Sequence, residues 1–538
     1  MPPALPTTAS APRLIFVAPL VAFAFFACFW NLGASSISSG DEGIHVRVMQ
    51  EMIETGRWVS PTLDGQPYFG KPPLKLALSK AVVLVFGDSN LAFRLLDGLA
   101  GFWTIVLTYA LALGMFRSPT IASIAALLLS INRVFLFRHV VREAVQDSML
   151  LLLSTAALFA GWKLLSLLAT GIEPDSSRHA RKLAALVGVL SGLAVLTKSA
   201  AGFFPLVIFY AALLPQIGPR SLFSRSTRIV WIPAACAMGF ALLYYGLNIL
   251  TIPDAGKQMI TVNIQERLLG KGFHHVKQWN LYLELVFKSG RVAPVGLVVV
   301  GFLVGALGCV RSDPRYQYLM AWSVIPLVGM SALSSRLDWY LAPAFPGIAL
   351  LCAAGLIGAL SSLTIAARRA PSFWRRTVAT LGAFLLSGYA CFSISRGALD
   401  VTQRVLHAGP PSAFERICRA IRSELRGSGP TGKVALFGLT DALSPRNAPF
   451  NLHKKVYLSM LAPYSVSVDS VEELTTLKDS GSLAFVFAPA SREAELKTLS
   501  PCALRLIPGR INRNPTEPGS WPAVVLAALT ACDSFRRW

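Results

Sequence analysis

The sequence predicts a polytopic α-helical membrane protein with a C-terminal soluble α/β domain, and three observations support this fold class. Of the 538 residues, 54% are hydrophobic and only 14% are charged, a composition far from the soluble average. The apolar residues gather in runs that are long enough, or nearly so, to cross a hydrocarbon core of roughly 30 Å as helices. After Ile394 these runs stop, and short strand-like and helix-like pieces take their place.

The apolar runs predict about eleven membrane crossings, with an uncertainty of about two. The longer runs are residues 14–30, 91–116, 149–168, 230–250, 292–309, 340–363 and 377–394. The shorter runs are residues 120–131, 183–196, 202–214 and 317–333. The first run is long and contains Trp30 without a small-residue cleavage site, so we interpret it as a retained anchor rather than a signal peptide.

The polar links between the runs alternate in length and charge. One set is short and arginine-rich, which the positive-inside rule places in the cytoplasm. It contains Arg117, Arg178, Arg181, Lys182, Arg220, Arg225, Arg228, Arg311, Arg315, Arg368, Arg369, Arg375 and Arg376. The other set is longer and holds most of the carboxylates and histidines, so we expect it outside; it comprises residues 33–90, 132–147, 251–291 and 334–339.

This pattern divides the chain into a transmembrane domain, residues 1–395 with its first outer loop at 33–90, and a C-terminal domain, residues 396–538. An odd number of crossings from a cytoplasmic N-terminus places the second domain outside the cytoplasm. Its expected strands are residues 434–438, 455–461, 484–488, 504–508 and 523–529. Its expected helices are residues 412–426 and 471–480.

The charge distribution and the cysteines argue against a nucleic-acid-binding protein and against a cysteine zinc site. The formal charge of +22 is spread between apolar spans, which favours contacts with membrane lipids over nucleic acid. Five cysteines fall in apolar runs and are expected as small buried residues: Cys28, Cys236, Cys309, Cys352 and Cys391. Any pair among Cys418, Cys502 and Cys532 could form one disulfide if this part faces an oxidising space. No cysteine pair has zinc-site spacing.

The first outer loop carries two adjacent carboxylates, Asp41 and Glu42, at an expected helix start after Ser38-Ser39-Gly40. A plain helix N-cap is the simplest interpretation of an isolated pair of this kind. The following residues favour a site instead, because they give the helix an apolar face that would lie along the membrane surface. These residues are Met49, Met52 and Ile53.

Two lysines, Lys71 and Lys75, follow in the same loop after a turn that contains Tyr68 and Gly70. The intervening Pro72-Pro73 stiffens this approach. A carboxylate and an ammonium fixed beside the bilayer suit a transferase, which must activate an acceptor hydroxyl and hold a lipid phosphate.

Two further ionisable residues lie at the ends of expected spans. Asp147 precedes a long apolar run, where it could cap the helix or act as a second catalytic carboxylate. Lys198 follows the run at residues 183–196, where it could bind the donor or extend toward the interface.

The later outer loops add basic and aromatic residues. Arg267 precedes the adjacent pair His274 and His275, and two neighbouring histidines cannot both bind one ion from a single helix face, so a metal site is the weaker interpretation. Arg336 and Tyr340 open the next span, in a segment typical of a membrane-interface belt.

Taken in order, these motifs resemble the GT-C superfamily of membrane glycosyltransferases. The resemblance extends over essentially the whole chain and is most specific in the first loop. The branch it looks most like contains the lipid A 4-amino-4-deoxy-L-arabinose transferase and bacterial relatives of the protein O-mannosyltransferases. The matching motifs are Asp41-Glu42, Gly65 to Pro73, Asp147, Thr197-Lys198, Arg267 to His275 and Arg336 to Pro346.

The resemblance implies a GT-C fold with about 11 to 13 transmembrane helices, and it implies roles for particular residues. Asp41 matches the catalytic carboxylate. Lipid-phosphate contacts would fall on Lys71, Arg267 and Tyr340, and Tyr68 would line the same cavity. The chain departs from aminoarabinose transferases at Gly70, where they usually carry an acidic residue, and at Ile44-His45, where they carry an Arg-Tyr pair.

The expected reaction is transfer of a sugar from a polyprenyl phosphate, of the undecaprenyl type, to a lipid A, glycan or protein acceptor, with inversion at the anomeric carbon. Asp41 would take the acceptor proton, with Glu42 and Asp147 as the other candidate carboxylates. No cofactor or metal is required, because lysine and arginine already neutralise a monophosphate. The candidate donor-binding residues are Tyr68, Lys71, Lys198, Arg267, His274, His275, Arg336 and Tyr340.

Two other function classes remain as alternatives. A polytopic transporter or lipid flippase usually shows repeated halves and ionisable groups near the bilayer midplane, whereas here these groups gather in outer loops. A non-catalytic sensor with a periplasmic domain would not need the Asp-Glu and Lys-Pro-Pro pair of the first loop.

The topology predicts that the C-terminal domain lies outside the cytoplasm. A reporter that is active only in the cytoplasm, fused after Trp538, should therefore stay silent. Reporter activity would contradict both the topology and the outer placement of the candidate site.

Overall fold

A computed structural model describes residues 11–38, 40–169, 178–218, 225–261 and 278–425, and several short segments between 434 and 528. The short segments are 434–437, 456–457, 465–468, 470–480, 484–489, 493–499, 504–507 and 524–528. Contacts divide the chain into two compact units. Unit 1 comprises Met1–Leu32, Trp58–Ser60 and Tyr68–Ala408. Unit 2 comprises Gly33–Arg57, Pro61–Pro67 and Gly409–Trp538.

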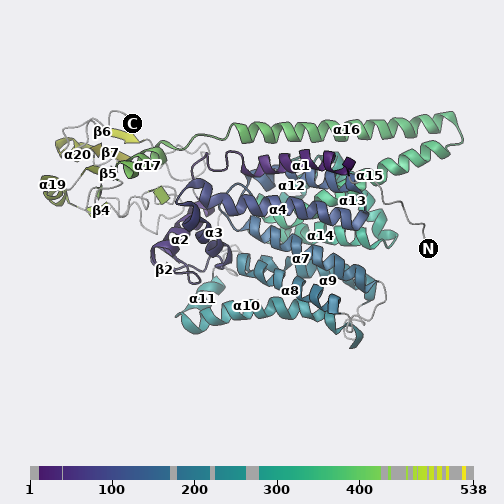
Figure 1. Ribbon diagram of the computed structural model, residues 1–538, viewed down its shortest axis with the longest axis horizontal. Helices are drawn as coiled ribbons and strands as arrows, with labels where there is room; N and C mark the ends of the chain where they lie inside the picture. Colours follow the sequence, from purple (N-terminus) through teal and green to yellow (C-terminus); the bar gives the residue numbers. More distant parts are fainter. Residues whose placement is uncertain are drawn as a thin grey trace. The chain divides into compact units, whose positions relative to one another are not determined.

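Unit 1 is a bundle of helices that run alongside one another (Figure 1). Every apolar run of the sequence lies on one of them, and six of the described helical segments are long and apolar enough to cross a membrane. The chain is therefore a multi-span membrane protein, as predicted. The α-helices are α1 (Ala11–Phe29), α3 (Leu74–Phe86), α4 (Asn90–Phe116), α5 (Pro119–Ser130), α6 (Arg133–Phe137), α7 (Asp147–Leu168), α8 (Arg178–Lys198), α9 (Phe204–Ile217), α10 (Ile232–Thr251), α11 (Ala255–Ile260), α12 (Leu281–Phe287), α13 (Val295–Val310), α14 (Pro314–Ser331), α15 (Phe345–Arg369) and α16 (Phe373–Leu406). The 3-10 helices are η1 (Ser199–Phe203), η3 (Arg225–Trp231) and η5 (Asp338–Ala344).

Short polar residues begin several of these helices. The side chains of Ser89, Ser118 and Asn132 each accept a hydrogen bond from the backbone N–H three residues on, and so cap α4, α5 and α6. Such a cap satisfies a donor that the helix leaves unpaired. Pro119 lies at the first position of α5, where its missing N–H is not needed.

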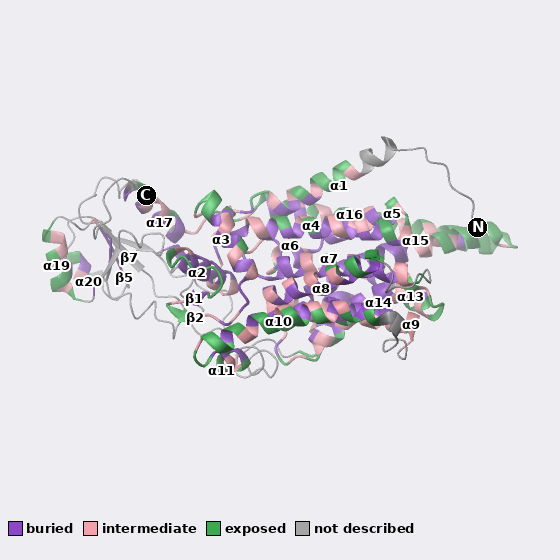
Figure 2. Cartoon of the chain, turned by 60° about the horizontal axis from the view of Figure 1, so that its bottom comes forward, coloured by how far each residue is buried: buried purple, intermediate pink, exposed green. Residues whose placement is uncertain are grey.

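Two large apolar clusters fill the bundle. Glycines allow the closest helix contacts: the backbones of α13 and α15 meet at Gly301 and Gly355, where a side chain on either would collide with the other helix. Figure 2 shows buried residues around α7 and exposed residues along α10. Helix α16 is also exposed along most of its length. Exposed apolar residues on α10 and α16, such as Leu250 and Phe384, are suited to contact lipid acyl chains. Cys391 belongs to this exposed face, so its predicted burial is wrong.

Unit 2 combines part of the first loop with residues beyond Gly409. The loop contributes helix α2 (Asp41–Glu54) and the antiparallel pair β1 (Thr62–Leu63) and β2 (Gln66–Pro67). The C-terminal part contains the helices α17 (Ala413–Leu425), α19 (Val471–Asp479) and α20 (Glu493–Leu499). Its strands are β3 (Val434–Phe437), β4 (Ser465–Val468), β5 (Phe485–Pro489), β6 (Leu504–Ile507) and β7 (Val524–Ala528).

The C-terminal strands form one mixed sheet in the order β4-β3-β5-β7-β6. Strand β3 pairs in parallel with β4 and β5, and β7 pairs antiparallel with β5 and β6. In β5, the consecutive residues from Phe485 to Ala488 are all buried. A continuous apolar run of this kind is typical of a central strand covered on both faces.

Several expectations from the sequence differ from the structure. The predicted strand at 455–461 is wrong where it is described, because Val456 and Tyr457 are helical. Strand β4 was missed because the alternation in Ser465–Val468 covers only four residues, and α3 was missed within the presumed polar loop. Helix α16 continues beyond residue 395 to Leu406.

The expected position of α2 on the membrane surface is also wrong. Met49 and Met52 are fully buried within the protein, so this face of the helix is not available to lipid. The helix packs inside a folded unit instead, although it was predicted correctly as a helix that begins at Asp41.

Candidate active site

A cavity of about 260 Å³ in unit 1 brings together residues that the sequence had singled out separately. Its walls come from the loop before α3, the start of α7, the junction of α8 with η1, the end of α14 and η5. Its ionisable lining residues are Lys71, Asp147 and Lys198. The remaining lining residues are Leu150, Ser199, Ala200, Ala201, Phe204, Gly329, Met330, Leu333, Tyr340 and Pro343.

Asp147 and Lys198 form an ion pair within the cavity. Their side chains are 6% and 11% exposed, and Lys198 Nζ lies 2.5 Å from Asp147 Oδ1. The ammonium also lies 5.3 Å from the centre of the Tyr340 ring, where the ring quadrupole attracts a cation. Asp147 is the first residue of α7, so the positive end of the helix dipole stabilises its negative charge.

The backbone turns sharply after Lys198. Ser199 has a φ of 49°, a left-handed conformation that is uncommon for a residue other than glycine. Four residues after Lys198, Gly202 lies so close to α8 that a Cβ atom there would be 2.1 Å from the backbone nitrogen of Val195. Only glycine permits this approach. The tight turn holds Lys198 at the N-terminal end of η1.

Lys71 reaches the cavity from the segment before α3 and is 7% exposed. The residue before it, Gly70, packs against the ring of Tyr68, and a Cβ at position 70 would lie 2.6 Å from the ring. The Tyr68 ring therefore occupies the space into which a larger residue at position 70 would extend its side chain. Pro72-Pro73 connects Lys71 to the first turn of α3.

Close in the chain to the cavity residues is a fully buried ion pair that the sequence did not predict. Lys75 Nζ lies 2.9 Å from Asp97 Oδ2, and neither side chain is exposed. Ser148 Oγ donates a hydrogen bond of 2.5 Å to Asp97 Oδ1. Lys75 lies on the first turn of α3, four residues after Lys71 in the chain, and Ser148 directly follows Asp147, so this network joins α3, α4 and α7 close to two residues of the cavity. Lys75 is therefore paired with Asp97 and is not among the residues that line the cavity.

Asp97 was missed because it lies inside an apolar run that was interpreted as a plain span. The signal was present, since ionisable residues inside a span are rare and usually functional or paired. Arg94, on the same helix, is also buried and donates a hydrogen bond to the carbonyl oxygen of Leu32.

The two carboxylates of the first loop lie in unit 2 and differ in their surroundings. Glu42 is fully buried, and its Oε2 accepts a hydrogen bond of 2.6 Å from the backbone N–H of Ser38. Asp41 is half-buried. The N-cap of α2 is Gly40, with a φ of 95° and no side-chain cap bond, so neither carboxylate is the simple N-cap that was the alternative interpretation.

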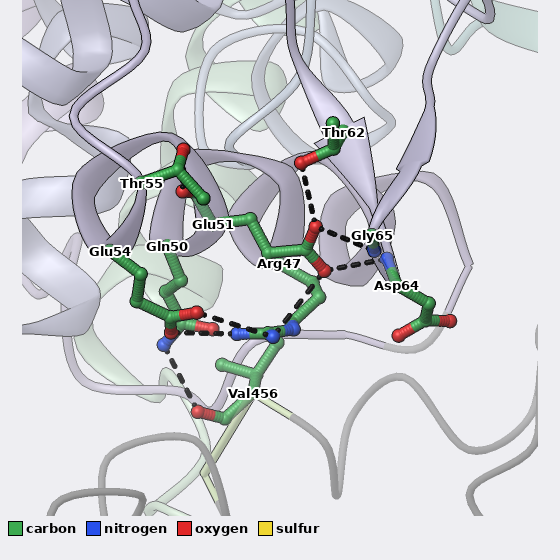
Figure 3. Close-up of polar contacts among 9 residues, drawn as sticks. All are labelled: Arg47, Gln50, Glu51, Glu54, Thr55, Thr62, Asp64, Gly65 and Val456. Carbon is green, nitrogen blue, oxygen red and sulfur yellow. Dashed lines mark hydrogen bonds and ion pairs between the residues drawn. The ribbon is translucent and has the colours of Figure 1, made fainter.

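The rest of α2 is held by an acidic and basic cluster (Figure 3). Glu51 accepts hydrogen bonds from Thr62 Oγ1 and from the backbone N–H groups of Asp64 and Gly65, which fixes the β1–β2 turn. Arg47 forms ion pairs with both Glu51 and Glu54. These contacts tie the helix to the hairpin that follows it in the loop.

Four other predicted site residues either do not line the cavity or lie outside the described residues. The Nε of Arg336 donates a hydrogen bond to the carbonyl oxygen of Ser331, and Arg336 is not among the lining residues of the cavity. Arg267, His274 and His275 lie outside the described residues. Among the residues that are described, no group of three or more histidines, cysteines or carboxylates could hold a metal ion.

A second cavity, of about 400 Å³, lies among α7, α9 and the start of α14. Its charged residues, Asp313 and Arg315, pair with each other at 2.6 Å. The pair is neutral overall, so this cavity offers no excess charge to a phosphate. The first cavity differs because two lysines face one aspartate.

Comparisons with known proteins find similar sequences and similar folds. Residues 19–245 match the family model described as dolichyl-phosphate-mannose-protein mannosyltransferase. Two curated relatives are undecaprenyl phosphate-alpha-4-amino-4-deoxy-L-arabinose arabinosyl transferases. The protein from Pseudomonas savastanoi pv. phaseolicola is 26% identical over 63% of this chain and 60% of its own length. The protein from Edwardsiella ictaluri is 27% identical over 58% of this chain and 54% of its own length. The matches thus span less than two thirds of these relatives.

Solved structures show the same fold. The crystal structure of ArnT from Cupriavidus metallidurans in the apo state has a TM-score of 0.61 at 16% identity, covering 97% of this chain and 99% of that one. The same protein bound to undecaprenyl phosphate has a TM-score of 0.60. The oligosaccharyltransferase AglB from Archaeoglobus fulgidus, in complex with an inhibitory peptide and a dolichol-phosphate, has a TM-score of 0.53 at 13% identity and covers 90% of this chain and 70% of that one.

The helical bundle therefore has the fold of these structures, which is the GT-C fold that the sequence predicted. Within that superfamily the chain resembles the undecaprenyl phosphate-aminoarabinose transferases. Both statements confirm the resemblance predicted from the sequence.

The buried Lys75–Asp97 pair predicts a specific pattern of stability. Lys75→Met should destabilise the protein by about 3–5 kcal/mol, because it leaves the charge of Asp97 buried without its partner. The double variant Lys75→Met/Asp97→Leu should recover most of that loss, because it removes both charges. Thermal melting in detergent would measure both effects, with the exposed Lys163→Met as the control. Equal melting of Lys75→Met and the control would show that the pair is not formed.

Proposed function

We propose that the protein is a glycosyltransferase that takes its sugar from a polyprenyl phosphate of the undecaprenyl type. The observation that supports this most strongly is the cavity in unit 1, where two lysines and one aspartate lie among apolar walls. Such a site suits a ligand with an anionic head and a hydrocarbon tail. The apolar walls favour the isoprenoid, and the lysines favour the phosphate.

The cavity also suits the chemistry of the departing group. When the bond between sugar and phosphate breaks, negative charge increases on the phosphate oxygens. Preplaced ammonium groups in a water-poor site stabilise that charge more in the transition state than in the ground state. We assign this role to Lys71 and Lys198. Asp147 would hold Lys198 in place through their ion pair and could also orient the acceptor.

We assign the role of general base to Asp41, as the resemblance to GT-C enzymes implies. It would accept the proton of the acceptor hydroxyl as that oxygen attacks the anomeric carbon, and a single displacement inverts this centre. Glu42 is the weaker candidate, because it is fully buried and already accepts a backbone hydrogen bond. Arg267 remains a proposed phosphate contact on the resemblance alone, and no step requires a metal ion.

The sugar and the acceptor are assigned only as classes. The curated relatives are aminoarabinose transferases. Next to Lys71, however, this chain has Gly70 in place of the acidic residue that such transferases usually carry, and the Tyr68 ring packs against it. We therefore propose a pentose or hexose donor and a lipid A, glycan or protein acceptor. The reaction would take place on the periplasmic face of a bacterial inner membrane, where the carboxylate-rich loops are expected.

Lys71 should contribute directly to donor binding. Lys71→Ala should weaken the binding of undecaprenyl phosphate by about tenfold or more, because a charge-assisted hydrogen bond contributes about 1.5–3 kcal/mol. Binding can be measured on purified protein in lipid nanodiscs, with Lys163→Ala as a matched lysine variant on an exposed face. If both variants bind undecaprenyl phosphate equally well, Lys71 makes no specific contact with the phosphate, and only the total positive charge of the protein contributes to binding.

Asp41→Asn tests the catalytic assignment. Asparagine keeps the size of aspartate but cannot accept the proton, so transfer of labelled sugar should fall by on the order of a hundredfold or more. Undecaprenyl phosphate binding and thermal melting should stay at the parental level. Near-parental turnover would move the catalytic assignment to Glu42 or Asp147.

A further inference from the structure

The backbone that leads into α2 is held by residues from the far end of the chain. The N–H of Ile37 donates a hydrogen bond of 2.8 Å to the hydroxyl oxygen of Tyr457. Ile37 and Tyr457 are both fully buried, although 420 residues separate them in the sequence. This contact lies within unit 2, four residues before Asp41.

A second contact lies one residue earlier. The hydroxyl of Ser36 donates a hydrogen bond of 2.5 Å to Glu415 on α17 and accepts one of 2.7 Å from the backbone N–H of Ser412. Arg419 donates a hydrogen bond of 2.8 Å to the other oxygen of Glu415, and Tyr457 also bonds to this carboxylate. Glu415 is 1% exposed, so the carboxylate is almost completely enclosed by hydrogen-bond donors.

Electrostatics agree with this geometry. Burial alone acts to raise the pKa of Glu415, but the hydrogen bonds from Ser36, Arg419 and Tyr457 outweigh it and hold the pKa below its usual value. Glu415 is thus favoured in its charged form, in which it accepts all of these bonds.

Helix α2 is also held at its third turn. The side-chain amide of Gln50 donates a hydrogen bond of 3.1 Å to the carbonyl oxygen of Val456 (Figure 3). Gln50 is 6% exposed and Val456 is fully buried. Residues 456–457 therefore contact both the segment before α2 and the body of α2, and this fixes the helix along its length as well as at its start.

We propose that Tyr457 and Glu415 are positioning residues, through which the C-terminal part of unit 2 sets the orientation of the first-loop helix and of Asp41. This inference rests on the proposed function, since it gives the positioned carboxylate its purpose. It also gives the C-terminal part a role in the transfer reaction itself, rather than in binding a separate ligand.

The contacts that hold the start of α2 are polar, and this supports a role in positioning the helix over a role in stability alone. Apolar side chains could hold α2 in place without the desolvation cost of a buried carboxylate, tyrosine and serine. A satisfied polar network has one geometry, however, whereas apolar packing tolerates small shifts. A shift of about 1 Å in a catalytic group can lower a rate by about a hundredfold, so a single geometry matters most beside Asp41.

The experiment uses Tyr457→Phe in the full-length protein. The variant keeps the ring and removes only the hydroxyl, which accepts the Ile37 N–H and bonds to Glu415. We expect kcat to fall on the order of tenfold to a hundredfold, with the KM for the donor and the affinity for undecaprenyl phosphate unchanged. Those two quantities depend on the cavity of unit 1, in which Tyr457 has no part.

Two further variants complete the design. Ser36→Ala removes the other link to Glu415 and should show the same fall in kcat. Tyr318→Phe is the matched control, because Tyr318 is a fully buried tyrosine of unit 1 whose hydroxyl donates a hydrogen bond to the carbonyl oxygen of Leu158. It should lower the melting temperature without changing kcat.

Hydrogen exchange separates this inference from the proposed function. Tyr457→Phe should raise amide exchange in residues 36–45, whether or not the parental protein transfers a sugar. Unchanged exchange there would overturn the positioning role, as would a kcat within twofold of the parent in an active preparation. A parental protein that neither binds undecaprenyl phosphate nor transfers sugar would instead reject the proposed function.

Discussion

Charge inside the membrane bundle must be paired, and this constraint determines the geometry of the candidate site. A lone buried ion is strongly unfavourable, whereas a pair with good geometry and further hydrogen bonds is tolerated. Lys75 is paired with Asp97 between α3 and α4, and Lys198 is paired with Asp147 between α8 and α7. Ser148 links the two pairs, because it bonds to Asp97 and directly follows Asp147. The pair of Lys198 and Asp147 therefore gives the cavity its charge and also joins two of its helices.

Much of the bundle could be predicted from the sequence, because helices that lie in lipid require long runs of apolar residues, and such runs are easily recognised. Helices such as α4 and α7 need long apolar runs, and their bounds in the structure agree closely with those runs. The pairing of Asp147 with Lys198 could not be predicted, because it depends on which helices pack together. The pairing of Lys75 with Asp97 could not be predicted for the same reason, since nothing near Lys75 in the sequence indicates that Asp97 lies opposite.

The first loop shows another limit of sequence reasoning. Its helix was predicted from Asp41 onward, but its apolar face was assigned to the membrane surface because the sequence shows no other partner nearby. In the structure Met49 and Met52 are buried within the protein, and Gln50 between them bonds to Val456, in a segment whose strand prediction was itself wrong. Contacts between such distant residues leave no local pattern. A buried polar network such as that of Ser36, Glu415 and Tyr457 becomes visible only in three dimensions.

The central claim is that the cavity of Lys71, Asp147 and Lys198 binds the phosphate of a polyprenyl carrier. The most direct measurement is photo-crosslinking of purified protein with a diazirine analogue of undecaprenyl phosphate, followed by mapping of the labelled peptides. The account predicts labelling of residues 198–204 and 329–343, suppressed by excess undecaprenyl phosphate. Labelling confined to the lipid-facing surfaces of α10 and α16, or labelling that undecaprenyl phosphate does not suppress, would contradict it.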